Sequence, residues 1–273
     1  VWIGFAQDVI KADDSNIHIE GSNYIYKKGD ELVLHRHSDK VYKGTTKENL
    51  FNPLKARTSS GILIKFKTNS PKIIAKFKIV KGNKSTSVFS IFQNGTFIEN
   101  SSFKYEPDSE ILINLESKYP GKDVVYKITF PLKTDIHFLG LELEDDYQLI
   151  EFESPNKPVY VACGNSITHG TGQKTTPETY AFQIAEKFGY ELFNVAVGGG
   201  KTSQVMAEMI ADDFKRIDVM TILIGFNDYN GQGIDIKTFY KRYDNMLKTL
   251  RSKHANTKIY CITMTYTNFK KSK

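Results

Sequence analysis

The chain has 273 residues, of which 40% are hydrophobic and 25% charged, as in a globular protein long enough for two domains. Apolar runs such as residues 222–224 have the length of a strand, so the sequence contains no membrane-spanning helix. The net charge of +6 comes mostly from dispersed lysines, and we therefore expect no nucleic-acid partner. Cys163 and Cys261 lie in apolar segments and are predicted to be buried thiols.

Hydrophobic and polar side chains alternate from about residue 17 to residue 152, which is typical of strands with one buried face. In residues 62–67, for example, the apolar side chains share one face and the lysines point to the other. Asn94-Gly95 between two apolar runs is a strong hairpin signal. Because helical periodicity is not convincing here, we predict an antiparallel β-sandwich for residues 1–153.

Two prolines within residues 154–158 stiffen the chain and remove backbone donors, as expected of a linker. Beyond this linker, strand-like segments alternate with amphipathic helical segments. The expected strands are residues 159–163, 192–197, 219–224 and 258–264, and the expected helices are residues 177–188, 202–214 and 239–250. This alternation predicts parallel βαβ units and a doubly wound α/β domain in residues 159–273.

Polar loops follow the expected strands. In a parallel sheet, the loops that follow strands lie together at the carboxyl edge, where ligands bind. Residues 164–170 contain a serine, residues 198–201 a run of glycines, and residues 225–228 an asparagine. These loops therefore bring a nucleophilic hydroxyl and two kinds of hydrogen-bond donor, backbone amides and a carboxamide, to one edge.

Each of these residues also has a purely structural interpretation. Ser166 alone is a common N-cap, the glycines would allow close helix packing, and Asn227 could bond its own loop. A phosphate-binding loop around Gly200 is also conceivable, because it would follow a strand and open a helix. That motif requires a glycine five residues before Gly200, and Val195 occupies the position, so the phosphate loop fails on spacing.

Taken together, the three loops resemble the sequence blocks of the SGNH (GDSL-type) esterases and lipases. The three blocks are matched, in family order, by Gly164-Asn165-Ser166-Ile167-Thr168, by residues 194–199 and by Gly225-Phe226-Asn227-Asp228. Residues 58–70 are similar to the jelly-roll domain that several carbohydrate esterases of this family carry. The resemblance implies a jelly-roll-like β-sandwich followed by an SGNH-type α/β domain that is truncated before its last strand and helix.

The resemblance also implies the roles of individual residues. Ser166 would attack an ester carbonyl, and the N–H groups of Ser166 and Gly199, with the side-chain amide of Asn227, would hold the oxyanion. Such preorganised donors are each worth ~10²–10³ in rate. Gly200 would replace Gly199 if the loop register shifts by one residue. The other residues expected to line the substrate site are Asn165, His169, Gly200 and Asp228. We expect no cofactor and no metal.

Two features depart from the family pattern. Asn165 stands where the family usually has aspartate, and no Asp-x-x-His block, which supplies the family's catalytic base, occurs before Lys273. His169 is a weak candidate for the base, and we expect it to line the rim of the site. A serine triad without its base keeps only about 10³–10⁴ of catalysis over water, so we expect this chain to be a poor catalyst.

The remaining histidines offer no better base. His254 is expected at the opposite edge of the parallel sheet. His35 and His37 alternate with Arg36 on an expected strand and are predicted to lie at the surface or between the domains. A metal site built on this pair would need a third ligand, which the sequence does not identify.

The predicted function is therefore serine-dependent hydrolysis of an ester, in particular the removal of acetyl groups from carbohydrate. The alternatives are a non-catalytic glycan-binding protein and a sugar O-acyltransferase. The expected partner is an acylated carbohydrate or another small ester, with no nucleic acid and no membrane. A missing last strand would leave an apolar sheet edge near residues 259–264, so we expect an oligomer or another segment to cover it. The resemblance and the first residue, Val1, favour a secreted or periplasmic location.

Overall fold

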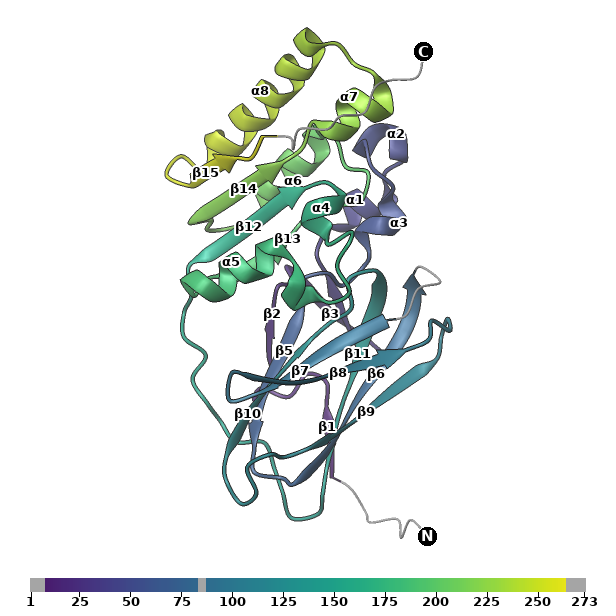
Figure 1. The fold of residues 1–273 in the computed structure, drawn as a ribbon, viewed down its shortest axis with the longest axis vertical. Helices are drawn as coiled ribbons and strands as arrows, with labels where there is room; N and C mark the ends of the chain where they lie inside the picture. Colours follow the sequence, from purple (N-terminus) through teal and green to yellow (C-terminus); the bar gives the residue numbers. More distant parts are fainter. Residues whose placement is uncertain (1–7, 83–86, 264–273) are drawn as a thin grey trace.

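The computed structural model describes residues 8–82 and 87–263. Its first half is built from antiparallel strands and its second half from a parallel sheet with helices (Figure 1). The strands of the first half are β1 (Asp8–Lys11), β2 (His18–Glu20), β3 (Tyr24–Lys28), β4 (Glu31–His35), β5 (Leu63–Thr68), β6 (Lys72–Gly82), β7 (Ser87–Gln93), β8 (Thr96–Phe103), β9 (Glu110–Glu116), β10 (Val124–Thr129) and β11 (Thr134–Leu143).

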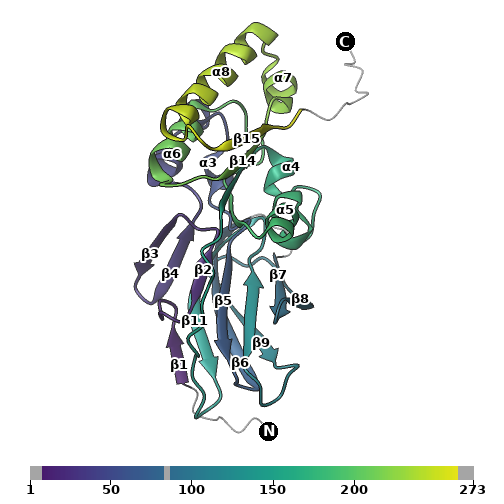
Figure 2. The same ribbon diagram turned by 90° about the vertical axis from the view of Figure 1, so that its left-hand side faces the viewer.

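These strands form two antiparallel sheets, which lie in the lower part of Figure 2. One sheet has the order β3-β4-β11-β6-β9, with β1 paired to β11, and the other has the order β2-β5-β10-β7-β8. A single hydrophobic core lies between them, in which Phe66 of the second sheet belongs to the same cluster as Phe77 and Phe138 of the first. Burying each such side chain contributes about 1.5–3 kcal/mol. The predicted antiparallel sandwich is confirmed.

Two local predictions in this half are also confirmed. Strands β7 and β8 form an antiparallel hairpin around Asn94 and Gly95, which have φ angles of 48° and 79°. Positive φ at both central residues is the type I′ geometry that asparagine and glycine favour. Along β5, Lys65 and Lys67 alternate with fully buried apolar side chains, and the Lys65 ammonium lies 2.5 Å from the carboxylate of Glu20.

Three short helices between β4 and β5 were not predicted. They are α1 (Asp39–Lys43), α2 (Thr46–Asn49) and α3 (Pro53–Ala56). Helices of four or five residues show no periodicity, but a capping box between Thr45 and Glu48 begins α2 and was a readable signal. Buried residues of this segment pack into the core of the second half, so helices α1–α3 join the two halves (Figure 1).

The second half has the predicted alternation of strands and helices. Its elements are β12 (Val159–Gly164), α4 (Ser166–His169), a 3₁₀ turn at Thr176–Glu178, α5 (Tyr180–Phe188), β13 (Glu191–Asn194), α6 (Gln204–Asp213), β14 (Val219–Leu223), α7 (Phe226–Gln232), α8 (Ile236–Lys253) and β15 (Lys258–Cys261). The described strands form a parallel sheet in the order β13-β12-β14-β15. Helices α6 and α8 pack on one face and α5 on the other, so the α/β prediction is confirmed.

Residues 147–158, which connect the halves, contain neither helix nor strand. The ammonium of Lys157 lies 3.0 Å from the carboxylate of Glu20 in the first half, which ties this connection to the β-sandwich. The domain boundaries at residues 153 and 159 stay a prediction. Residue 264, the end of the last expected strand, lies outside the described residues.

Only one of the two cysteines is buried as predicted. Cys163 on β12 is 3% exposed, whereas Cys261 on β15 is exposed. The prediction for Cys261 is wrong because β15 is an outer strand of the described sheet, where most of its side chains are open to solvent. Neighbouring Tyr260 is 58% exposed.

We expect one fast thiol alkylation in the folded protein. Burial raises the pKa of the Cys163 thiol to about 12, so about one part in 10⁴ would be thiolate at pH 8. Treatment with iodoacetamide at pH 8, followed by intact mass spectrometry, should show one adduct in native protein and two after denaturation. Cys261→Ser should remove the fast adduct. A fast second adduct in folded Cys261→Ser protein would contradict this assignment.

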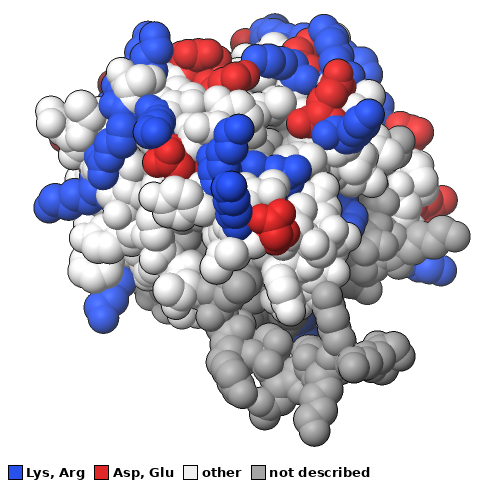
Figure 3. Space-filling view, turned by 90° about the horizontal axis from the view of Figure 1, so that it is seen from above, with Lys and Arg blue, Asp and Glu red and all other residues white. Residues whose placement is uncertain are grey.

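Lysine and arginine side chains at the end of the molecule formed by the second half stand in separate groups with acidic side chains between them (Figure 3). On the β-sandwich, several lysines are paired with carboxylates, among them Lys78 with Glu31 at 2.5 Å. The positive charge is therefore not gathered into one patch on the face shown. None of the described helices is both long and apolar enough to cross a membrane.

Candidate functional site

Ser166 lies where β12 turns into α4, at the carboxyl edge of the parallel sheet. The N-cap of α4 is Asn165, whose side-chain oxygen accepts the N–H of Ile167 at 3.0 Å. The alternative in which Ser166 serves as the N-cap is therefore wrong. Ser166 is the first helical residue and half-buried, and N–H groups at this position have no acceptor within the helix.

In the glycine loop after β13 (residues 198–201), the N–H groups of two glycines already have acceptors within the protein. Gly198 donates its N–H to Nδ1 of His169 at 3.2 Å, and Gly200 donates its N–H to the carbonyl of Val197 at 2.9 Å. Gly199 lies between them with a φ of 85°, a conformation that favours glycine. The N–H groups on both sides of Gly199 are thus used within the protein.

The three predicted loops meet at Gly200. A Cβ atom on Gly200 would lie 3.1 Å from the carbonyl oxygen of Gly164 and 3.8 Å from the Cα of Asn165, next to Ser166. From the other side, the amide of Asn227 at the start of α7 donates to the carbonyl of Gly200 at 3.0 Å. A carboxamide nitrogen carries two hydrogens, so one of them remains for a second acceptor.

Asp228 is a positioning residue. The side chain is fully buried, and it accepts hydrogen bonds from the N–H of Thr202 at 3.0 Å and from the hydroxyl of Thr202 at 2.5 Å. These bonds hold the loop after β13 against α7. The expectation that Asp228 touches substrate is corrected, because its carboxylate faces the protein interior.

His169 is also buried, at 6% exposure, and does not line the rim. Since its Nδ1 accepts the N–H of Gly198, the ring proton is on Nε2, which lies 2.7 Å from the hydroxyl oxygen of Thr58. Burial, together with the charge of Arg36, holds the pKa of His169 well below its usual range. The ring is therefore neutral and has both nitrogens engaged, so neither nitrogen is free to act as a general base.

The four residues that were expected to line the substrate site are all buried: Asn165, His169, Gly200 and Asp228. Sequence position alone places these residues on the right loops, but which side chain points outward depends on the packing beneath each loop.

Two residues directly after β4 hold residues 194–196, the segment just before the glycine loop. Arg36 is fully buried and donates to the carbonyls of Thr58 at 2.6 Å and Ala196 at 2.9 Å, and also to that of Asn194. Nε2 of His37 lies 2.9 Å from the carbonyl of Val195. Burial lowers the pKa of Arg36 to about 10, so the guanidinium stays charged at neutral pH.

The sequence predicted His35 and His37 to lie at the surface or between the domains. The interdomain alternative is correct for His37, which contacts Val195, and the surface alternative is wrong for both, since they are at most 4% exposed. The only sequence signal for this burial was a cationic residue, Arg36, close to the apolar residues 32–34. His254 caps the C-terminus of α8, before β15, at the amino edge of the sheet as predicted.

Comparison with known proteins gives a matching family model and several similar folds. Residues 162–272 match the model of the GDSL-like Lipase/Acylhydrolase family. No curated protein matches the chain. Among solved structures, salicylyl-acyltransferase SsfX3 from a tetracycline biosynthetic pathway aligns with a TM-score of 0.79 at 18% identity, over 93% of this chain and 71% of that chain.

Two carbohydrate esterases are also similar in structure. A family two carbohydrate esterase from Cellvibrio japonicus aligns with a TM-score of 0.68 at 14% identity, over 94% of this chain and 79% of that chain. The acetyl xylan esterase Est2A from Butyrivibrio proteoclasticus aligns with a TM-score of 0.64 at 12% identity, over 94% of this chain and 81% of that chain. At these identities the structural likeness shows the fold. Residues 162–272 of this chain therefore match a GDSL-like lipase/acylhydrolase domain, a family of ester hydrolases, and the described part of the chain has the fold of the carbohydrate esterases.

Proposed function

We propose that this protein transfers the acyl group of an ester to Ser166, with the oxyanion held by the N–H groups of Ser166 and Gly199 and by the side-chain amide of Asn227. The observation that carries this proposal is the meeting of three loops at Gly200, which lies against the end of β12 and accepts a hydrogen bond from Asn227. The N–H groups of Gly198 and Gly200 are engaged, which supports Gly199 as the donor.

In the proposed reaction, the Ser166 oxygen attacks the ester carbonyl and the alcohol leaves. The hydroxyl proton passes to solvent or to the leaving alkoxide. The donors stabilise negative charge that develops only in the transition state, which is why they accelerate the step. No histidine of the chain takes this proton in the described structure, since His169 is neutral and engaged on both ring nitrogens. We therefore expect slow turnover, about 10³–10⁴ above the reaction in water.

The proposed substrate is an acetylated carbohydrate, and the proposed location is secreted or periplasmic. Both proposals draw on the resemblance to carbohydrate esterases, and the substrate is supported by the printed names of two structural neighbours, a family two carbohydrate esterase and an acetyl xylan esterase.

The proposal is tested by trapping the acyl-enzyme. Incubation with 4-nitrophenyl acetate should add one acetyl group to the wild-type chain, and peptide mapping should locate it on Ser166. Ser166→Ala should lose this adduct, whereas Ser252→Ala, which changes an exposed serine near the end of α8, should retain it. Intact mass spectrometry over time gives the acylation rate.

Two results would oppose the proposal. Equal acylation of wild-type protein and Ser166→Ala would assign the nucleophile elsewhere. Absence of acylation in wild-type protein at saturating ester would favour the alternative of a non-catalytic glycan-binding protein, which equilibrium binding of unacylated oligosaccharide would then test.

Acyl transfer to a sugar hydroxyl is the second candidate function. The alignment with a salicylyl-acyltransferase favours it, because hydrolysis and transfer use the same acyl-serine and differ only in the acceptor. Product analysis with an acceptor sugar present separates the two. A transferred acyl group that increases with sugar concentration indicates transfer, and free acetate independent of sugar indicates hydrolysis.

A further inference from the structure

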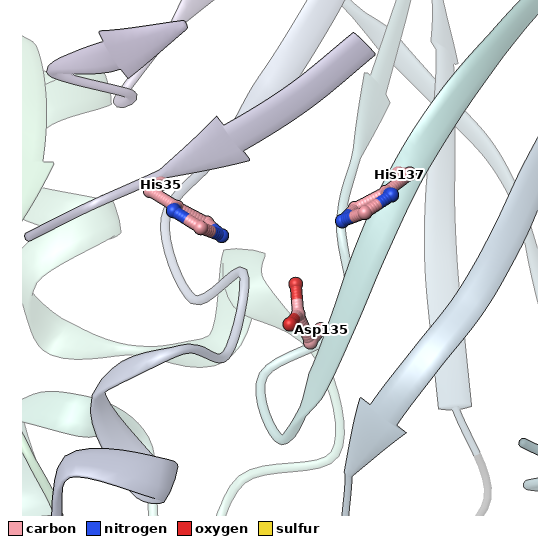
Figure 4. Close-up of side chains that lie close together, drawn as sticks. All are labelled: His35, Asp135 and His137. Atoms are coloured by element: carbon pink, nitrogen blue, oxygen red, sulfur yellow. The ribbon is translucent and has the colours of Figure 1, made fainter. Parts of the chain in front are cut away.

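Three side chains converge on the outer face of the six-stranded sheet, away from Ser166. His35 comes from β4, and Asp135 and His137 come from β11 (Figure 4). One ligand atom from each residue lies within 4.8 Å of the other two. All three residues are at most 4% exposed, so this His35–Asp135–His137 cluster is buried.

The pairing of two strands explains why these side chains meet. Strand β4 pairs with β11 at a single residue pair, Leu32 opposite Phe138. Leu32 and Phe138 face the sandwich core, and continuing the antiparallel register places His35 opposite Asp135. On its other side, β11 has a register shift between Asp135 and Ile136, the kind of irregularity that redirects side chains.

One polar atom in the cluster has no partner. Oδ1 of Asp135 makes no hydrogen bond to any described residue, and Asp135 is only 3% exposed, so bulk water does not satisfy this atom either. A buried carboxylate oxygen without a donor costs free energy unless a ligand or proton compensates it. In Figure 4 the carboxylate points into the space between the two imidazole rings.

A second carboxylate orients one of these rings. Nδ1 of His137 lies 2.6 Å from Oε2 of Glu31, which leaves Nε2 of His137 as the nitrogen available to the cluster. The other oxygen of Glu31 lies 2.5 Å from the ammonium of Lys78. A carboxylate that holds the far nitrogen of a histidine is the usual support of a metal-bound imidazole.

Burial disfavours charge on all three side chains of the cluster. It lowers the pKa of His35 to about 4 and also lowers the pKa of His137. Burial raises the pKa of Asp135 to about 7, against the opposing charges of Arg57, Arg36 and Lys28. Those cations disfavour a loosely held ion, so binding depends on direct bonds to the three ligands.

We propose that His35, Asp135 and His137 form a binding site for a divalent transition-metal ion, for which Zn²⁺ is the probe. Two imidazoles and one carboxylate suit this class of ion, whereas Mg²⁺ and Ca²⁺ prefer oxygen ligands throughout. Donors of a tetrahedral zinc ion lie about 3.4 Å apart, so side-chain rotations must draw the three ligand atoms together from separations of up to 4.8 Å.

A metal ion at this site would link β4 to β11 close to the contact between the two halves of the molecule. His35 precedes Arg36, whose guanidinium donates to the carbonyl of Ala196, just before the glycine loop. The ring of His35 also packs against Tyr42 of α1, with ring centroids 4.7 Å apart. A metal ion would therefore fix the end of β4 from which the β-sandwich supports the second half.

The test is zinc binding by the full 273-residue chain. After removal of metal with a chelator and dialysis, calorimetric titration with Zn²⁺ should show one ion per chain, and Mg²⁺ at the same concentrations should show none. Asp135→Asn, His35→Gln and His137→Gln should each weaken zinc binding about 100-fold or more. His18→Gln, which changes a histidine on β2 outside the cluster, should bind zinc like wild type.

Melting temperatures distinguish loss of the metal site from unfolding of the variant. Asp135→Asn keeps the shape of the side chain and removes its buried charge, so its melting temperature without metal should not fall. Zinc should raise the melting temperature of wild type and of His18→Gln, and leave that of Asp135→Asn unchanged. Absence of zinc binding in wild type, or binding that all three cluster variants retain, would overturn the site.

Discussion

Replacing Arg36 with methionine should lower the free energy of unfolding by about 3–5 kcal/mol. Arg36 is fully buried and donates to the carbonyl oxygens of Thr58 and Ala196, in the two halves of the molecule. Methionine has a similar length but no donor, so buried carbonyl oxygens lose their partners at about 1–3 kcal/mol each. Urea denaturation followed by far-UV circular dichroism measures the change.

The matched control for this variant is Arg216→Met. Arg216 pairs with Asp218 at the surface, where its side chain is 55% exposed. Surface ion pairs contribute about 0–1 kcal/mol, so this variant should unfold almost as wild type does. Equal losses in the two variants would show that the interdomain hydrogen bonds of Arg36 contribute little to stability.

Replacing Asn227 with alanine should slow acylation of Ser166 about 10²–10³-fold. The carboxamide donates one hydrogen to the carbonyl of Gly200, which leaves the second hydrogen for the developing oxyanion. Alanine removes both donors. The rate of acetyl adduct formation from 4-nitrophenyl acetate, followed by mass spectrometry, gives the effect directly.

Asn230→Ala is the control, because Asn230 lies on the same helix and is exposed. It should acylate at the wild-type rate. Loss of the Asn227 bond to Gly200 should cost about 0.5–1.5 kcal/mol of stability, which denaturation of Asn227→Ala would verify. A rate within threefold of wild type for Asn227→Ala would remove Asn227 from the proposed oxyanion hole.

Much of the fold could be predicted from the sequence, because it depends on local periodicity. Alternating residues in β5 and β11 predicted the antiparallel sandwich, and alternating strand and helix patterns predicted the parallel sheet. Asn94-Gly95 predicted its hairpin because positive φ angles are a property of those two residues. Helices α1–α3 were missed because four or five residues carry no period, although the Thr45–Glu48 capping box was present.

The loops of the candidate site were predicted at the correct strand ends, but the roles of their side chains were only partly predictable. The roles of Ser166 and Gly199 stay proposals. His169 and Asp228 were expected at the surface of the site and instead lie beneath it, bonded to Gly198 and Thr202. Chain position determines which loop a residue belongs to, whereas burial depends on neighbours that are distant in the sequence.

By itself, then, the sequence determined the two types of sheet and the three loops at the carboxyl edge, since each follows from residues close together in the chain. Only the tertiary structure decided that Arg36 reaches the carbonyl of Ala196 and that His35 lies beside Asp135 and His137. These contacts join residues about 100 or more positions apart, and hydrogen-bond and ligand geometry act through space, so no local pattern records them.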